Sequence, residues 1–301
     1  MNPISFEDQV AVITGAGGGL GKTYALELAR RGASVVVNDL GGNPDGTGSG
    51  SSPAETTVAE IKAAGGEAVA NFDSVATPEG GQAIIDAAVS NFGRVDIVIN
   101  NAGILRDKTF HNMTPEFLDP VLDVHLRGAF FVSQPAFRQM KEQQYGRLLF
   151  TTSAAGLFGN FGQTNYAAAK MGLVGLSNTL AIEGAKANIT SNVIAPLART
   201  RLTDELMGPM GEKLGPELVT PMAVYLVSRE CTLTHETFAA GAGWFGKVFV
   251  GLAPGAFPAE GGGVPTVEEI RDRIGDIRAE DGYIVPTDAT NAMGPIMKVL
   301  Q

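Results

Sequence analysis

Short apolar runs alternate along most of the chain with longer segments in which apolar residues recur at helical spacing. The apolar runs are rich in Val and Ile and show little polar alternation, which indicates strands buried on both faces, as in a parallel sheet. These predicted strands cover residues 9–14, 34–38, 68–72, 95–100, 147–152 and 190–195. The predicted helices cover residues 22–31, 54–64, 78–92, 115–144 and 165–187. Strand–helix alternation of this kind predicts right-handed βαβ crossovers.

The fold class that follows is α/β, with a Rossmann-type doubly wound parallel sheet in a single domain. After about Pro196 the pattern loosens, and residues 253–265 are rich in Gly and Pro. We therefore expect the domain to cover residues 1–250 and to include a substrate-side flap at about 196–215. Residues 251–301 are expected to form a C-terminal extension that is not an independent domain.

Charge and composition argue against several classes of function. The chain carries 22 basic and 32 acidic residues, and its net charge of −10 argues against a nucleic-acid or anionic-lipid partner. Its single cysteine, Cys231, rules out an intrachain disulfide and fits a reducing compartment. His111 and His235 have no metal-ligand neighbours at useful spacing, so no metal site is expected.

Targeting and membrane signals are also missing from the sequence. No stretch approaches the ~18 uninterrupted apolar residues that a spanning helix needs. Residues 1–7 lack the basic region and apolar run of a secretory signal. We therefore expect a cytoplasmic protein with no membrane partner.

Glycine is in clear excess: 39 of the 301 residues are Gly, about 13%, against an average usage of roughly 7%. Five of these glycines lie between Gly15 and Gly21, directly after the first predicted strand and at the start of a helix. Gly15, Gly19 and Gly21 would permit a tight turn and let backbone N–H groups approach a pyrophosphate at the helix N-terminus. The spacing departs from the common G-x-G-x-x-G pattern, and such a segment could be only a turn. Its place between strand and helix favours a dinucleotide-binding loop.

Asp39 ends the second predicted strand, 18 residues after Gly21. A carboxylate at this point can accept hydrogen bonds from both ribose hydroxyls of NAD, and it would repel the 2′-phosphate of NADP. Gly18 and Leu40 offer no basic group to bind that phosphate. Asp39 could be an ordinary turn residue, but the glycine loop ahead of it favours the ribose contact. The sequence therefore predicts NAD as the cofactor.

Tyr166 and Lys170 are four residues apart in a predicted helix and therefore share one helix face. Ser153 follows a predicted strand, at the edge where open α/β sheets place their ligands. A free tyrosine has a pKa near 10, and a nearby ammonium favours its phenolate. We expect Tyr166 to act as a general acid/base whose pKa Lys170 lowers. The Tyr-x-x-x-Lys pattern is weak alone, but chance explains it poorly beside Ser153 and the glycine loop.

The segment Asn100–Gly103 ends the fourth predicted strand. Its short amides could tie neighbouring strands together and shape the floor of a cofactor site, or they could simply cap a turn. The order of T-G-x-x-x-G-x-G, N-N-A-G, the serine and Y-x-x-x-K resembles that of the classical short-chain dehydrogenase/reductase family, over roughly residues 7–250. Further segments look like the (3R)-hydroxyacyl-CoA dehydrogenase domains of peroxisomal multifunctional enzymes of type 2, also called 17β-hydroxysteroid dehydrogenases type 4. These segments are VNDLGG at 37–42, NAGILRD at 101–107, VHLRG at 124–128 and GNFGQ at 159–163.

The resemblance implies a role for each matching residue. Tyr166 would be the general acid/base at the substrate oxygen, and Lys170 would lower the pKa of Tyr166 and hold the nicotinamide ribose. Ser153 would hydrogen-bond the substrate carbonyl or hydroxyl. Asp39 would bind the adenosine ribose, and Asp73 the adenine. The motifs imply further cofactor-binding residues: Gly15, Gly19, Leu20, Gly21, Asn101 (near the nicotinamide ribose), Ala102, Gly103, Pro196, Leu197 and Thr200.

Two departures from the family pattern concern the site. His125 stands where most classical members carry the asparagine of N-x-x-G. It could be a catalytic residue that relays protons through water, or only a buried polar residue with a hydrogen bond, because a neutral imidazole has both a donor and an acceptor. The usual Pro-Gly after the sixth strand is Pro196-Leu197 here, so either Thr200 or Thr203 could contact the nicotinamide carboxamide.

The resemblance implies an NAD-dependent oxidoreductase that interconverts a (3R)-hydroxyacyl-CoA and a 3-ketoacyl-CoA. A dehydrogenase of hydroxysteroids or of sterol side-chain CoA esters is the nearest alternative, so the partner would be a small acyl-CoA or steroid-like substrate. A dinucleotide-binding protein without turnover is a third possibility, and the intact Ser153, Tyr166 and Lys170 argue against it. The family also implies a homodimer in which residues 118–144 and 166–187 pack between subunits.

Overall fold

A computed structural model describes residues 3–200, 213–257 and 263–297. The chain divides into two compact units, Met1–Lys247 and Val248–Gln301. The first is built on an eight-stranded sheet with the strand order β3-β2-β1-β4-β5-β6-β7-β8. The strands are β1 Val10–Thr14, β2 Ser34–Asn38, β3 Glu67–Asn71, β4 Ile97–Asn100, β5 Gly146–Thr151, β6 Ile189–Leu197, β7 Thr237–Gly241 and β8 Trp244–Val248.

Strands β1 to β7 pair in parallel, so most of their connections must cross over the sheet. Longer helices make these crossovers: α1 Gly19–Arg30, α2 Ser52–Ala63, α3 Pro78–Phe92, α4 Pro115–Leu122, α5 Gly128–Gln143, α7 Thr164–Gly184 and α9 Thr220–Leu226. The short helix α6 Ala154–Phe158 follows β5. Strand β8 follows β7 after a two-residue turn, Ala242-Gly243, in which both φ angles are positive (52° and 77°), as in a type I′ hairpin.

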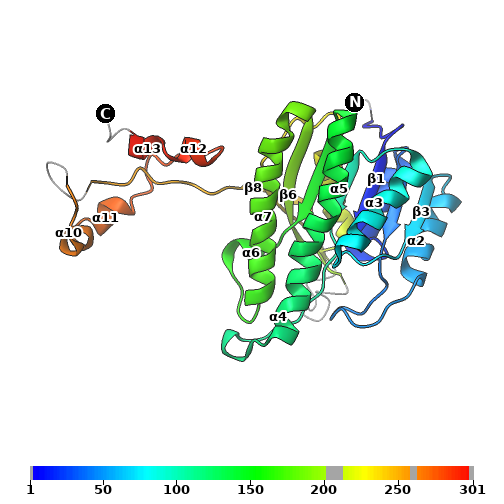
Figure 1. Ribbon diagram of the computed structural model, residues 1–301, viewed down its shortest axis with the longest axis horizontal. Helices are drawn as coiled ribbons and strands as arrows, with labels where there is room; N and C mark the ends of the chain where they lie inside the picture. The colour runs from blue at the N-terminus through cyan, green and yellow to red at the C-terminus, as the bar shows by residue number, and fades with distance from the viewer. Residues whose placement is uncertain (1–2, 201–212, 258–262, 298–301) are drawn as a thin grey trace. The chain divides into compact units, whose positions relative to one another are not determined.

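Helices cover both faces of the sheet. Successive residues of a strand point to opposite faces, so Ala11 and Ile13 pack with α1, α2 and α9, whereas Val10 and Val12 pack with α3, α5 and α7. Figure 1 shows α3, α5 and α7 lying over one face. This double burial explains the continuous Val and Ile runs of the sequence. The predicted Rossmann-type doubly wound sheet is confirmed.

The helix predicted over residues 115–144 is interrupted. Helix α4 ends at Leu122, a π-helical segment covers Asp123–Arg127, and α5 begins at Gly128. Such bulges are rare and often occur at functional sites. This bulge could not be predicted, because apolar spacing continues across it. Strand β7 was also not predicted, because its sequence TFAAG lacks the β-branched run of the other strands.

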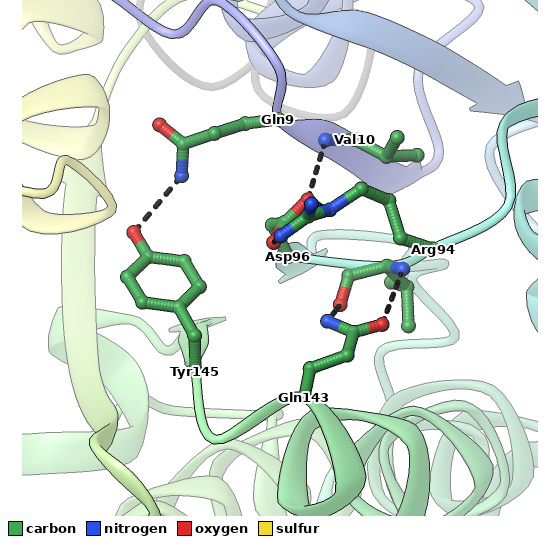
Figure 2. Close-up of polar contacts among 7 residues, drawn as sticks. Gln9, Val10, Arg94, Asp96, Gln143 and Tyr145 are labelled. Carbon is green, nitrogen blue, oxygen red and sulfur yellow. Dashed lines mark hydrogen bonds and ion pairs between the residues drawn. The ribbon is translucent and has the colours of Figure 1, made fainter.

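A polar cluster fastens the end of the sheet at which β1 and β4 begin. The carboxylate of Asp96 is fully buried, accepts two hydrogen bonds from Arg94, each of 2.7 Å, and accepts another from the Val10 N–H at 2.9 Å. Figure 2 shows this pair beside Gln143 and Tyr145, whose hydroxyl accepts a hydrogen bond of 2.9 Å from Gln9. These contacts satisfy buried polar groups far from the carboxyl ends of the strands, and they serve the fold.

In the described residues of the second unit there are four short helices: α10 Val267–Asp272, α11 Ile274–Ile277, α12 Ala289–Ala292 and α13 Gly294–Met297. The rings of Phe249 and Tyr283 stack at a centroid distance of 5.7 Å. None of the residues whose burial is described in this unit is buried. Over all the described residues of the chain, none of the helices is long and apolar enough to cross a membrane.

Candidate active site

A cleft of about 220 Å³ lies at the carboxyl ends of β1, β4, β5 and β6. The residues that sequence analysis assigned to the site meet there, with the exception of Gly21 and Asp73. Those that line it are Gly15, Gly19, Leu20, Asp39, Asn101, Ala102, Gly103, His125, Ser153, Tyr166, Lys170, Pro196, Leu197 and Thr200. Other residues that line the cleft were not predicted to do so, among them Leu105, Thr151 and Thr152. Thr151 and Thr152 could have been found as the last positions of a predicted strand, next to Ser153.

The glycine loop is shaped by close backbone approaches. Gly15 and Gly19 have φ angles of +65° and +52°, a region that side chains rarely permit. A Cβ atom on Gly15 would lie 2.9 Å from the Cα of Ala102. Gly21 does not line the cleft, but a Cβ atom there would collide with the carbonyl oxygen of Gly15. Gly21 therefore allows helix α1 to pack directly behind the loop.

The side chains of Asn101 and Thr14 fix this loop to the segment that follows β4 by hydrogen bonds. The side-chain amide of Asn101 donates to the carbonyl oxygens of Thr14 and Gly15, at 3.0 and 3.2 Å. The Thr14 hydroxyl accepts from the N–H groups of Asn101 and Ala102, each at 3.0 Å. Of the two alternatives for the N-N-A-G segment, the first holds for Asn101, which ties β4 to the end of β1. Thr14 was not singled out in the sequence, although its hydroxyl side chain directly precedes the loop.

Asp39 is buried at the end of β2 and lines the cleft. Its Oδ2 accepts a hydrogen bond of 2.8 Å from the N–H of Gly17, and its Oδ1 accepts one of 2.7 Å from the N–H of Gly41. Each carboxylate oxygen retains a further lone pair. The carboxylate therefore fixes the glycine loop and still has acceptor capacity for a ligand.

A second cleft adjoins the first and shares Gly15, Asp39, Ala102 and Gly103 with it. Asp73 lines this second cleft, where its carboxylate accepts a hydrogen bond of 2.7 Å from the Asn71 side chain. Residues of the 41–50 loop form part of its wall. Asp73 is thus separated from the tyrosine end of the site and lies on the other side of Asp39.

Ser153 and Tyr166 lie together at the opposite end. Ser153 is the N-cap of α6, and its hydroxyl accepts from the Ala155 N–H at 3.2 Å. Burial raises the pKa of Tyr166 above 10, a hydrogen bond with the Ser153 side chain lowers it in part, and the charge of Asp107 adds to the increase. The hydroxyl of Tyr166 is therefore protonated at neutral pH.

Lys170 departs from the expectation for an ammonium that activates Tyr166. Its Nζ donates to the Thr151 carbonyl oxygen at 2.6 Å and lies 5.5 Å from the centre of the Tyr166 ring. Burial lowers the pKa of Lys170 from 10.5 to about 7, so the side chain is only partly charged at neutral pH. The spacing of the two residues correctly places them on one helix face, but it does not show that Lys170 is buried.

His125 lies in the π-helical segment and packs edge-on against Tyr166, with ring centroids 5.1 Å apart. Its Nε2 is 3.0 Å from the N of Ile104 and 2.8 Å from its carbonyl oxygen. The Nδ1 atom is buried and has no hydrogen-bond partner among the described residues. Burial and the charge of Lys170 hold the pKa of His125 well below 6.5, so the imidazole is neutral. A Cβ atom on Gly103 would collide with this ring, which explains the glycine.

The predicted flap at 196–215 is described only in part. Pro196, Leu197 and Thr200 line the cleft, as assigned. Thr203, the alternative to Thr200, lies outside the described residues.

Comparisons with known proteins agree with this geometry. Residues 9–207 match the family model described as short chain dehydrogenase. Peroxisomal multifunctional enzyme A of Dictyostelium discoideum is 48% identical over 98% of this chain, which covers 65% of that enzyme. A hydroxyacyl-CoA dehydrogenase of Mycobacterium tuberculosis is 38% identical, with 75% of each protein aligned.

Among solved structures, the full-length peroxisomal multifunctional enzyme type 2 of Drosophila melanogaster superposes with a TM-score of 0.83 at 37% identity. The match covers 99% of this chain and 50% of that one. The chain thus spans between half and two thirds of the length of these two multifunctional relatives. It belongs to the short-chain dehydrogenase family, and it is an oxidoreductase.

Proposed function

We propose that this chain is an NAD-dependent dehydrogenase that interconverts (3R)-hydroxyacyl-CoA and 3-ketoacyl-CoA, with Tyr166 as the general acid/base. The observation that carries the proposal is the joint placement of Ser153, Tyr166 and Lys170 in the cleft that also contains the glycine loop. An acid/base residue and a dinucleotide loop in one cleft are what the transfer of a proton and a hydride requires.

The residues present fit a dinucleotide. The cradle at Gly15 and Gly21 has no room for a Cβ atom, and its backbone could approach a pyrophosphate closely. Asp39 has acceptor capacity for ribose hydroxyls and presents a negative charge to a 2′-phosphate, which favours NAD over NADP. When bound, the nicotinamide would supply the hydride acceptor or donor. Asn101 would act by bracing the loop, while Thr200 and Leu197 would border the nicotinamide end.

The protein's own part in the reaction is the movement of one proton. In the direction of oxidation, Tyr166 would first give up its own hydroxyl proton, and the resulting phenolate would take the proton of the substrate hydroxyl as the hydride leaves the same carbon. Ser153 would hold the substrate oxygen beside Tyr166, since its side chain already hydrogen-bonds the tyrosine. Lys170 and His125 both lie beside the Tyr166 ring and would take up the proton that Tyr166 gives up and pass it to solvent.

The acyl-CoA substrate is supported by the relatives. The Mycobacterium tuberculosis relative is named as a hydroxyacyl-CoA dehydrogenase. The 3R stereochemistry is supported by the segments at 124–128 and 159–163, which resemble those of (3R)-hydroxyacyl-CoA dehydrogenase domains. A hydroxysteroid or a sterol side-chain CoA ester is the alternative substrate. The hydrogen bond between the Ser153 side chain and Tyr166 argues against a protein that binds a dinucleotide without turnover.

One experiment tests this proposal directly. The purified full chain would be assayed for NAD reduction with 3-hydroxyacyl-CoA esters of several lengths and both stereochemistries, together with a steroid alcohol. We expect turnover with the 3R esters. Turnover with the steroid alone would select the alternative, and dinucleotide binding without any turnover would overturn the proposal.

We further propose a homodimer and a cytoplasmic location. Exposed apolar side chains on α5 and α7, namely Phe130, Met171 and Ile182, support packing between subunits. Sedimentation that shows only monomer at working concentration would contradict the dimer. The lack of buried residues described in the second unit supports our proposal that residues 251–301 are an extension of the domain over residues 1–250.

A further inference from the structure

The loop over the adenosine end of the site is docked onto the segment that follows β4. It is ordered internally: the N–H of Asn43 donates to the carbonyl of Thr47 at 2.7 Å, and the N–H of Gly50 donates to the carbonyl of Leu40 at 2.9 Å. The Leu105 N–H donates to the Pro44 carbonyl oxygen at 3.0 Å. The loop therefore has a defined shape and a defined docking face.

The side chain of Arg106 connects the 41–50 loop to helix α4. Its Nε donates to the carbonyl oxygen of Asp45 at 2.8 Å, and its Nη1 donates to the carbonyl oxygen of Glu116 at 2.7 Å. Asp45 is at the tip of the loop, and Glu116 is in the first turn of α4. One guanidinium thus ties two segments that are 71 positions apart in the chain. A planar fork of donors suits this geometry, whereas an ammonium is a single point charge.

The backbone of Arg106 is itself fixed to the start of α7, the helix that contains Tyr166 and Lys170. Asn165 is buried, and its side-chain amide donates to the carbonyl oxygens of Arg106 and Phe117, at 2.9 and 2.8 Å. Its Oδ1 accepts the N–H of Tyr166 at 2.8 Å. The backbone of Arg106 is therefore held in a fixed relation to the start of α7, and its side chain extends from that fixed point to the loop.

We propose that Arg106 is a positioning residue for the cofactor: it clamps the 41–50 loop over the cleft that contains Asp39 and Asp73. Loop residues Gly42, Asn43 and Gly46 line that cleft, so the clamp sets the width of the proposed adenosine pocket. The proposal rests on the proposed dinucleotide function. Arg106 does not line either cleft, so its effect on the ligand is indirect.

Binding of cofactor fragments separates this role from general damage. ADP-ribose contains the adenosine and lacks the nicotinamide, whereas reduced nicotinamide mononucleotide has the opposite composition. We expect Arg106→Met to raise the Kd of ADP-ribose about tenfold, which corresponds to about 1.4 kcal/mol. The Kd of reduced nicotinamide mononucleotide should change less than twofold. Calorimetry and nicotinamide fluorescence on the full chain measure the two constants.

Charge must be distinguished from clamping, because ADP-ribose is anionic. Arg106→Lys keeps the charge but not the two-pronged fork, so its Kd for ADP-ribose should lie closer to that of Arg106→Met than to that of the wild type. Full recovery by lysine would overturn the clamp, since charge alone would then explain the effect. Equal losses for both fragments would also overturn it.

A matched glycine pair tests the same loop without changing Arg106. Gly46 has a φ of +84°, and a Cβ atom there would lie 2.9 Å from Ile104 Cδ1, whereas Gly48 has a φ of +73° and its nearest neighbour at 3.6 Å. Both alanine variants carry a penalty for positive φ, but only Gly46→Ala requires the loop and the Ile104 side chain to move apart. We expect Gly46→Ala to raise the Kd of ADP-ribose at least fivefold more than Gly48→Ala. Equal effects would contradict the docking role. A wild type that binds neither fragment would instead overturn the proposed function.

Discussion

Lys170 directs its Nζ at the carbonyl oxygen of Thr151, 2.6 Å away, while that nitrogen lies 5.5 Å from the centre of the Tyr166 ring. Lys170 is buried and Tyr166 is half-buried, and this burial shifts the pKa of each side chain toward its neutral form. The pKa of Lys170 is therefore lower in the folded protein than in the unfolded chain, so Lys170 makes the stability of the protein depend on pH.

We expect Lys170 to make the protein more stable as the pH rises from 7 toward 10. In this window the folded Lys170 is mostly neutral, since its pKa is about 7, but in the unfolded chain it is still charged, with a pKa near 10.5. The unfolded state then binds more protons, so the free energy of unfolding increases with pH by up to about 1.4 kcal/mol per unit. Urea unfolding at pH 7, 8 and 9 measures this slope.

The control for this slope is Lys170→Met, which keeps the length of the side chain and removes the ionisable group. As the pH rises, the free energy of unfolding of the wild type should increase relative to that of the variant. Parallel curves would mean that Lys170 keeps its charge in the folded protein.

Tyr166→Phe should abolish turnover and leave NADH binding nearly unchanged. The substitution removes only the hydroxyl, so the ring still packs edge-on against His125. General acid/base catalysis contributes roughly 10²–10⁴-fold, and the loss should be at least that large. Steady-state kinetics and NADH fluorescence titration give the two numbers. A variant that keeps its turnover would exclude Tyr166 as the acid/base.

Much of this site could be predicted because its chemistry lies in short segments at strand ends. Ser153, Asp39 and the glycine loop each follow a run of apolar residues that is buried on both faces, and a parallel sheet brings such ends together. The π-helical turn around His125 could not be predicted, since one extra residue in a turn leaves the apolar spacing almost intact. The lowered pKa of Lys170 is a consequence of tertiary burial, which the spacing of Tyr166 and Lys170 does not encode.

Asp39→Ala should weaken binding of NAD more than binding of NADP. The variant is expected to lose the two hydrogen bonds that the Asp39 carboxylate would accept from the ribose of NAD. Hydrogen bonds to charged groups contribute about 1.5–3 kcal/mol each. For NADP the same substitution also removes a repulsion. The variant loses the contacts to the N–H groups of Gly17 and Gly41 as well, so its thermal stability must be measured alongside the two Kd values. A wild type that already prefers NADP would disprove the ribose argument.

Asp96→Asn should lower stability without affecting the cofactor. The buried carboxylate holds Arg94 and the N–H of Val10, and an amide of the same shape would present an N–H donor to one of these donor groups. Loss of charged hydrogen bonds costs about 1.5–3 kcal/mol, which urea unfolding at pH 7 can resolve. The Kd of NADH should be unchanged because the cluster lies at the other end of the strands. A raised Kd of NADH would mean that the two ends of the sheet are coupled.

His125 is expected to carry protons in its neutral form. Its Nε2 can either accept the N–H of Ile104 or donate to the carbonyl oxygen of Ile104, so both tautomers keep a partner on that side. Nδ1 is correspondingly a donor or an acceptor, so the neutral ring, which its lowered pKa favours, would take up a proton at one nitrogen and release one from the other through water. His125→Ala should therefore lower turnover roughly 10-fold to 100-fold and change the shape of the pH–rate profile. His125→Asn, which restores a donor and an acceptor, should recover part of the loss. If His125→Ala slows turnover but leaves the pH–rate profile unchanged, the ring only supports Tyr166 by packing against it.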